Sequence, residues 1–229
     1  MGKNVKEFFA KSGDYVKDLN ENVSSIFKKS DKKSIFKKDN FDFSTYEQVL
    51  KKLSSRRSCR KFSSKKVDLK VIYEIITASL KAPCAGGIEN VSVVIISDEH
   101  KRHNLAKIHS EQTWAGEAPI MLAVICDTNE LKSLYGFDYE NLALQNATLV
   151  TGSIVNLVSL TDLECCIVRA GDDEKTSHEL GVGDGMFVSC LIPVGYCDDI
   201  KPDFVRSPEN EKIFFDSFGN HEPSGGGHH

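Results

Sequence analysis

The residues with the clearest potential for chemistry form a short basic cluster, Arg56-Arg57-Ser58-Cys59-Arg60. Arginine presents a planar fork of N–H donors that matches a phosphate bidentately, and it stays charged at any working pH. The cluster follows a helical pattern over residues 46–53, so it should occupy a loop at the end of a helix. It predicts an anion receptor; a solvated basic turn and a nucleic-acid contact are the alternatives.

A second candidate is the small-residue segment Pro83-Cys84-Ala85-Gly86-Gly87, which lies between a helical pattern and a strand-like run. Glycines and other small residues let the backbone approach a flat ligand closely. The thiol of Cys84 is either redox-active or an inert small side chain. The segment therefore predicts a ligand-facing loop.

These two segments need a scaffold, and the hydrophobic periodicity predicts an α+β domain with helices lying on a mixed sheet. We expect helices over 44–54, 68–81, 99–112, 138–160 and 173–180, and strands over 91–97, 119–126, 164–168 and 187–196. The helix over 138–160 is apolar on nearly every face. It is therefore expected to be central, or buried between subunits.

Four regions are expected along the chain: an extension (1–40), the main domain (41–203), a tail that packs on a partner subunit (204–223) and a purification tag (224–229). The extension is lysine-rich and has apolar residues at helical spacing. It is expected to pack on the body or on a second subunit. Attachment to an acidic membrane surface is the less favoured alternative.

Composition narrows the function classes further. The net charge of −4 over 229 residues argues against general nucleic-acid binding. The apolar runs are strand-sized, and no signal peptide is expected. The seven cysteines lack the spacing of a zinc site or a disulfide framework, so no metal is expected. They predict buried, reduced thiols in a cytoplasmic protein.

Five motifs in a fixed order resemble the nitroreductase family. They are Arg56-Arg57-Ser58-Cys59-Arg60-Lys61-Phe62, Ala82-Pro83-Cys84-Ala85-Gly86-Gly87, Ala118-Pro119 before a strand, Gln145-Asn146 on the long helix, and Pro193-Val194-Gly195-Tyr196. The resemblance covers roughly residues 46–196. It implies a mainly antiparallel sheet flanked by helices in an intertwined homodimer.

The resemblance also implies a cofactor, FMN. Arg56, Arg57 and Ser58 would hold its phosphate, with Arg206 as a further basic contact, and Arg60 would reach the pyrimidine edge of the ring. A cation there would stabilise negative charge on the reduced ring.

The family pattern implies a role for two further segments. The Pro83–Gly87 loop would lie against the ring from the other subunit. A backbone N–H from Arg169, Ala170 or Gly171 would bond the ring near N5 or O4.

The implied activity is hydride transfer from NAD(P)H through FMN to an electron-poor small-molecule acceptor, such as a nitro compound or a quinone. The chain departs from the family pattern at Cys84, usually serine, at Gly87, usually asparagine, and at Asp162 and Glu164, usually glycines. These departures leave two alternatives. One is a degenerate member with weak flavin binding and a regulatory role. The other is a flavin enzyme of different chemistry, such as reductive dehalogenation or flavin breakdown.

Overall fold

The computed structural model describes residues 46–108, 112–169, 171, 173–198 and 212–220. The chain divides into two units, Met1–Asp199 and Ile200–His229, and each is considered by itself. The described part of the second unit is a short turn-rich segment in which the rings of Phe214 and Phe218 lie 4.6 Å apart. The predicted extension 1–40, Ala170 and Arg206 lie outside the described residues, so what was expected of them stays a prediction.

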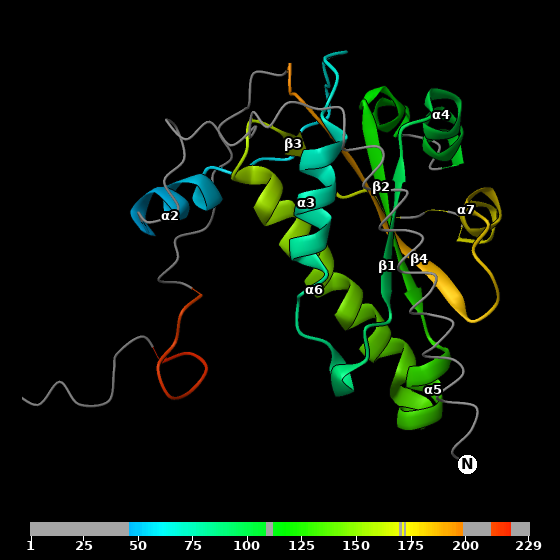
Figure 1. Cartoon of the computed structure of the whole chain (residues 1–229). Helices are drawn as coiled ribbons and strands as arrows, with labels where there is room; N and C mark the ends of the chain where they lie inside the picture. The colour runs from blue at the N-terminus through cyan, green and yellow to red at the C-terminus, as the bar shows by residue number, and fades with distance from the viewer. Residues whose placement is uncertain (1–45, 109–111, 170, 172, 199–211, 221–229) are drawn as a thin grey trace, which may run out of the picture. The chain divides into compact units, whose positions relative to one another are not determined.

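The first unit is built on a four-stranded sheet in the order β1-β2-β4-β3 (Figure 1). All three strand pairs are antiparallel, in agreement with the predicted sheet. The bounds of the strands are β1 Val91–Ile96, β2 Ile120–Asp127, β3 Glu164–Cys165 and β4 Met186–Gly195.

The central strand β2 is buried on both faces, and its side chains alternate between two cores. Ile120, Leu122 and Val124 face one apolar cluster. Met121 and Ala123 face the other. This alternation requires a layer of helices on each side of the sheet.

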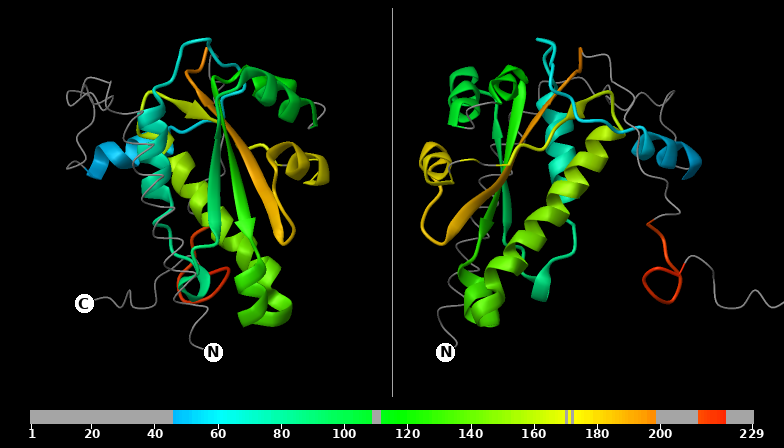
Figure 2. Two further views of the ribbon diagram at one scale, coloured as in Figure 1. Left: turned by 45° about the vertical axis from the view of Figure 1, so that its right-hand side comes forward. Right: turned by 180° about the vertical axis from the view of Figure 1, so that it is seen from behind.

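Figures 1 and 2 show these two layers. On one side lie α3 and α6, with α2 beside them; on the other lie α4 and α7. The bounds of the helices are α2 Tyr46–Ser54, α3 Leu69–Ser79, α4 Glu99–Ile108, α5 Asn129–Tyr135, α6 Tyr139–Ser159 and α7 Asp173–Leu180. Three 3₁₀ turns join them: η1 Ala85–Gly87, η2 Thr113–Glu117 and η3 Gly136–Asp138. The predicted α+β class is confirmed.

Three details differ from the sequence-based expectation. Helix α4 is described from Glu99 to Ile108, and residue 112, expected as its last residue, instead precedes the tighter turn η2 that begins at Thr113. Strand β3 has two residues instead of five, because beyond it only Val168 forms a bridge, to Leu191 of β4. The seven-residue helix α5 was not expected, since so short a segment gives little periodicity.

Helix α6 is buried on one face only, which corrects the expectation of a helix apolar all round. The residues that pack on the sheet and on α3 are Ala143, Asn146, Ala147, Val150, Thr151, Ile154, Val155 and Val158. The opposite face is mostly polar or small, but Leu144 and Leu149 are exposed on it. The stretch Asn129–Ser159 is long and apolar enough to cross a membrane. The burial of α6 against the sheet instead identifies it as a core helix.

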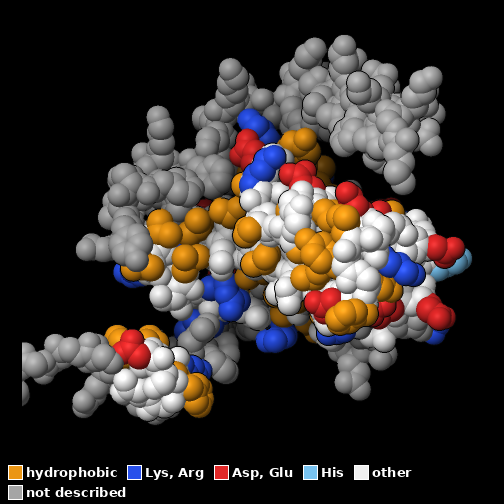
Figure 3. Space-filling model, turned by 90° about the horizontal axis from the view of Figure 1, so that it is seen from below, with side chains coloured by type: hydrophobic (Ala, Val, Ile, Leu, Met, Phe, Trp, Pro, Cys, Tyr) orange, Lys and Arg blue, Asp and Glu red, His pale blue; other side chains and the backbone are white. Residues whose placement is uncertain are grey.

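Exposed apolar side chains also gather at the end of the unit where α5 and the first turns of α6 lie. Leu134, Tyr135 and Phe137 are all exposed there, and Phe137 is 99% exposed. Figure 3, which views the molecule from this end, shows hydrophobic side chains in patches between charged ones. Exposed apolar side chains that gather at one end in this way are typical of a contact with another protein.

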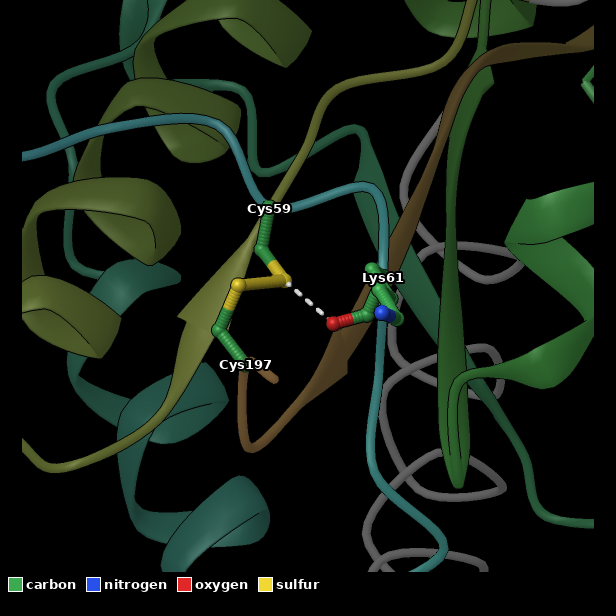
Figure 4. Close-up of a disulfide and its surroundings, with 3 residues drawn as sticks. All are labelled: Cys59, Lys61 and Cys197. Carbon is green, nitrogen blue, oxygen red and sulfur yellow. Dashed lines mark hydrogen bonds between the residues drawn. A yellow bond between two sulfur atoms is a disulfide. The ribbon is translucent and has the colours of Figure 1, made fainter. Parts of the chain in front are cut away.

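A disulfide joins Cys59 to Cys197, two residues 138 positions apart (Figure 4). Cys59 is 2% exposed, and its Sγ lies 3.3 Å from the carbonyl oxygen of Lys61. The expectation of reduced thiols is therefore wrong for these two cysteines. Their spacing gave no signal, because only the fold brings the segment before Phe62 beside the end of β4. The other five cysteines are free.

We predict that reduction lowers the stability of the protein by about 3–5 kcal/mol, because the cross-link closes a long loop in the unfolded chain. Urea unfolding with and without a phosphine reductant measures the difference. The double variant Cys59→Ala/Cys197→Ala is the control and should unfold at the same urea concentration in both conditions. Identical midpoints for the unaltered protein, or seven alkylatable thiols without reductant, would contradict the pairing.

Candidate functional site

The basic cluster lies in an extended segment attached to the edge of the sheet. Ser58 forms a parallel bridge with Cys165 of β3, and the N–H of Cys59 donates to the carbonyl oxygen of Cys165 at 3.2 Å. Further along, the N–H of Ser63 donates to the carbonyl oxygen of Tyr196 at 2.9 Å. Together with the disulfide, these bonds hold the cluster in place despite the mutual repulsion of its charges.

The three guanidinium groups of the cluster are differently placed. Arg60 is exposed, as is Ser58, whereas Arg56 and Arg57 are half-buried. Nη1 of Arg57 donates to the carbonyl oxygen of Arg56 at 2.9 Å and to that of Ser54 at 3.4 Å, so it caps the end of α2. Cationic side chains at this position stabilise the negative end of a helix dipole.

Within the described residues, none of these three arginines forms an ion pair with a carboxylate; the one ion pair there joins Lys70 to Glu74. Uncompensated positive charge costs free energy through self-repulsion. It is favourable when an anion binds. Exposed Ser58 and Arg60 with half-buried Arg56 therefore fit a phosphate, and their assignment to one stays a prediction.

The chain after β3 runs along β4 and carries the other predicted contacts of the same half-site. Val168 exchanges both backbone hydrogen bonds with Leu191 at 2.8 Å, which leaves Arg169 and Gly171 exposed beyond it. The four steps along the chain from Cys165 to Arg169 span about 13 Å when the backbone is extended. The basic cluster and Arg169 thus lie along one edge of the sheet. The Arg169 side chain lines a cavity of about 460 Å³, with Tyr139, Leu144 and Phe187 among the other lining residues.

Two acidic residues stand where the resemblance implies glycines, and both lie at the start of this edge of the sheet. Asp162 is exposed in the turn before β3, and Glu164 is half-buried in β3. Arg56 and Glu164 shift the pKa of the neighbouring Cys165 thiol in opposite directions. Burial raises the pKa of Cys165 to about 12, Arg56 opposes that rise and Glu164 adds to it. The thiol is therefore protonated at neutral pH and is not a nucleophile.

The small-residue loop lies at the opposite end of α6. The N–H of Ala85 donates to Oδ1 of Asn146 in the second turn of the helix at 2.9 Å. The basic cluster is instead bonded to Cys165, just past the C-terminus of α6. Thirteen residues separate Asn146 from Ser159, which corresponds to about 20 Å along the axis. One chain therefore does not bring Arg56–Arg60 and Pro83–Gly87 together.

The loop has the backbone geometry that its glycines allow. Gly86 has φ of 63° and Gly87 has φ of 72°, a region that favours glycine. Cys84 is half-buried, and the Oη of Tyr135 lies so close to Gly86 that a Cβ would approach it to 2.4 Å. Asn146, which anchors the loop, belongs to one of the five motifs in the sequence but was not predicted to be a site residue. The signal for it was one carboxamide on the buried face of an apolar helix.

The sequence pattern of the Nitroreductase family matches residues 53–196. An "FMN reductase [NAD(P)H]" of Bacillus subtilis is 27% identical over 172 residues, and an "Iodotyrosine dehalogenase 1 homolog" of Caenorhabditis elegans is 24% identical over 188. The alignments cover 73% and 68% of this chain. They cover 62% and 57% of the relatives, so the chain spans less than two thirds of the length of either.

Solved structures agree on the fold. An FMN-dependent nitroreductase from Clostridium difficile superposes with a TM-score of 0.64 at 23% identity, covering 74% of this chain and 99% of the other. B. megaterium NfrA2 gives 0.67 at 17%, covering 74% of each chain. The family match covers more than half of the chain and coincides with the sheet and its flanking helices. The chain therefore belongs to the nitroreductase family.

Proposed function

We propose that this chain binds FMN and passes reducing equivalents from NAD(P)H to an electron-poor small molecule. The observation that carries the proposal is the basic cluster on the sheet edge of a nitroreductase-family domain, which has no carboxylate partner in the part of the chain that the structure describes. The name of the Bacillus subtilis relative supports it, since that protein is an FMN reductase using NAD(P)H. FMN would supply the redox chemistry by accepting and donating a hydride at its ring.

The protein's own residues would bind and orient the cofactor. Arg56 and Ser58 would hold the phosphate, and Arg57 would add charge while it caps α2. Arg60 would place its cation at the pyrimidine edge, where it stabilises negative charge. A backbone N–H from Arg169, Ala170 or Gly171 would complete the ring's hydrogen bonds, and Arg206 would add a further contact to the phosphate.

We further propose that the active form is a homodimer with two shared sites. The two predicted ligand-binding segments of one chain lie at opposite ends of α6, so a second copy is needed to complete each site. The outer face of α6 is suited to such a contact because it carries Leu144 and Leu149, which are 39% and 46% exposed. The proposed use of NAD(P)H as the electron donor is consistent with a cytoplasmic enzyme.

Reductive dehalogenation is the second candidate. It is favoured by the likeness to the Caenorhabditis elegans protein, which extends over 188 residues. Release of iodide from iodotyrosine under reducing conditions would identify this activity. Reduction of nitroaromatics or quinones without iodide release would exclude it.

The phosphate assignment predicts that FMN binds more tightly than riboflavin. Arg56→Ala should weaken FMN binding about 10- to 150-fold, because a charge-assisted hydrogen bond contributes about 1.5–3 kcal/mol. Riboflavin binding should be unchanged. Fluorescence quenching titrations of both ligands give the affinities, and Lys107→Ala on the opposite helix layer is the control. Equal affinities for FMN and riboflavin in the unaltered protein would contradict the assignment.

The assignment of Arg60 to the ring predicts a different phenotype. Arg60→Ala should lower the flavin reduction potential by a few tens of millivolts, since about 30 mV corresponds to 1.4 kcal/mol for a two-electron couple. Arg56→Ala should leave the potential nearly unchanged, because a phosphate contact is the same in both redox states. Spectroelectrochemical titration measures both. Equal shifts in the two variants would show that the roles are not divided in this way.

The dimer proposal predicts that Leu149→Asp converts the protein to a monomer and weakens FMN binding at the same time. A carboxylate in an apolar interface is costly to desolvate. Light scattering and flavin titration on the same samples provide both readouts, with Lys107→Gln on α4 as a control that lowers the net charge by the same single unit. If the unaltered protein is a monomer and still binds FMN tightly, the shared site is refuted.

A further inference from the structure

We infer that Asn146 and Asn90 act together as positioning residues for the Pro83–Gly87 loop, and we call this pair the asparagine clamp. The part of the inference that concerns flavin binding rests on the proposed function. The two carboxamides belong to α6 and to the segment entering β1. Neither touches the basic cluster. Their role is to fix the loop that would face the flavin of the other subunit.

The geometry is a continuous chain of hydrogen bonds. Oδ1 of Asn146 accepts from the N–H of Ala85 at 2.9 Å, and Nδ2 of Asn146 donates to Oδ1 of Asn90 at 2.7 Å. Nδ2 of Asn90 donates to the carbonyl oxygen of Asp127 at 2.9 Å, and the N–H of Asp127 returns a bond of 2.9 Å to the carbonyl oxygen of Asn90. The loop, α6, β1 and β2 are thereby connected.

Burial makes these bonds difficult to replace. Asn146 is 2% exposed and Asn90 is 7% exposed, so water cannot substitute freely for a lost partner. A buried polar group left without a partner costs about 1–3 kcal/mol. Asn146 also stands on a face of α6 whose other members are mainly apolar. Burial of a carboxamide on this apolar face costs free energy unless it is hydrogen-bonded, and the bond to the loop supplies that partner.

The loop has few other constraints in the described structure. Its own backbone bonds are local, from the N–H of Gly87 to the carbonyl oxygen of Cys84 at 3.3 Å and from Ile88 to Ala85 at 3.1 Å. Tyr135 confines it from one side through the close approach to Gly86. Ala85 also packs against the apolar cluster that includes α6 residues, but Asn146 supplies the directional hydrogen bond from α6 to the loop. The exposed face of the same helix carries Leu149, which is proposed to lie in the subunit interface. The asparagine clamp would therefore fix the position of the loop relative to that interface.

The experiment compares two variants that each remove a buried hydrogen bond from α6. Asn146→Ala frees the loop, whereas Thr151→Val removes only the contact of its hydroxyl with the Cys190 sulfur at 3.4 Å. Both should lower thermal stability. Hydrogen exchange of the amides at 84–88, measured without flavin, should accelerate at least tenfold in Asn146→Ala and remain unchanged in Thr151→Val.

Flavin titration then tests the functional part. Asn146→Ala should weaken FMN and riboflavin binding by the same factor, about tenfold, because the loop would contact the ring and not the phosphate. Asn90→Ala should reproduce this effect, and the double variant should be no worse than either single variant, since both act through one chain of bonds. If Asn146→Ala does not fold, Asn90→Ser tests the same chain from its other end.

The outcomes separate the clamp from the proposed function. Equal exchange rates in Asn146→Ala and Thr151→Val would overturn the clamp. Faster exchange with unchanged flavin affinity would overturn its link to the cofactor. A protein that binds no flavin would refute the proposed function, while the exchange measurement would still decide whether the clamp exists.

Discussion

The packing of α6 against the sheet is the constraint on which the candidate site depends. Ile154 and Val158 are fully buried against the sheet layer, so the helix cannot shift without opening the core. Because α6 is rigid, it fixes the separation between the loop bonded to its second turn and the edge strand that follows its last turn. A ligand that needs both segments must therefore bind where two copies meet.

The segment bonded to edge strand β3 is under a different constraint, since it carries three arginines that have no carboxylate partner among the described residues. The segment from Ser58 to Ser63 is kept in place by strand-like bonds to β3 and to the end of β4, and by the bond between Cys59 and Cys197. Such fixed positive charge favours an anion more than a flexible chain would, because less ordering is needed on binding. The disulfide makes this preorganisation dependent on the redox state of the compartment.

Much of the fold was predictable from local patterns. The helical periodicity of residues 173–180 and the apolar run over 119–126 marked elements almost to the residue, and the order of the motifs indicated the family. The disulfide and the asparagine clamp were not predictable in this way. Both join residues that are far apart in the sequence, and the identity of a single Cys or Asn does not indicate which distant residue it will contact. Arg57 shows a third limit, because a side chain chosen as an anion ligand also caps α2.

The central claim is that each flavin site is made from two chains, and complementation between two defective variants tests it most directly. Arg56→Ala damages the basic cluster, and Asn146→Ala damages the loop at the other end of α6. If the two proteins are mixed, unfolded and refolded together, half of the dimers are heterodimers with one site free of both lesions. About a quarter of all sites should then bind FMN with the affinity of the unaltered protein. Absence of any high-affinity sites in the refolded mixture, with dimers present, would show that each site is formed within one chain and would contradict the account.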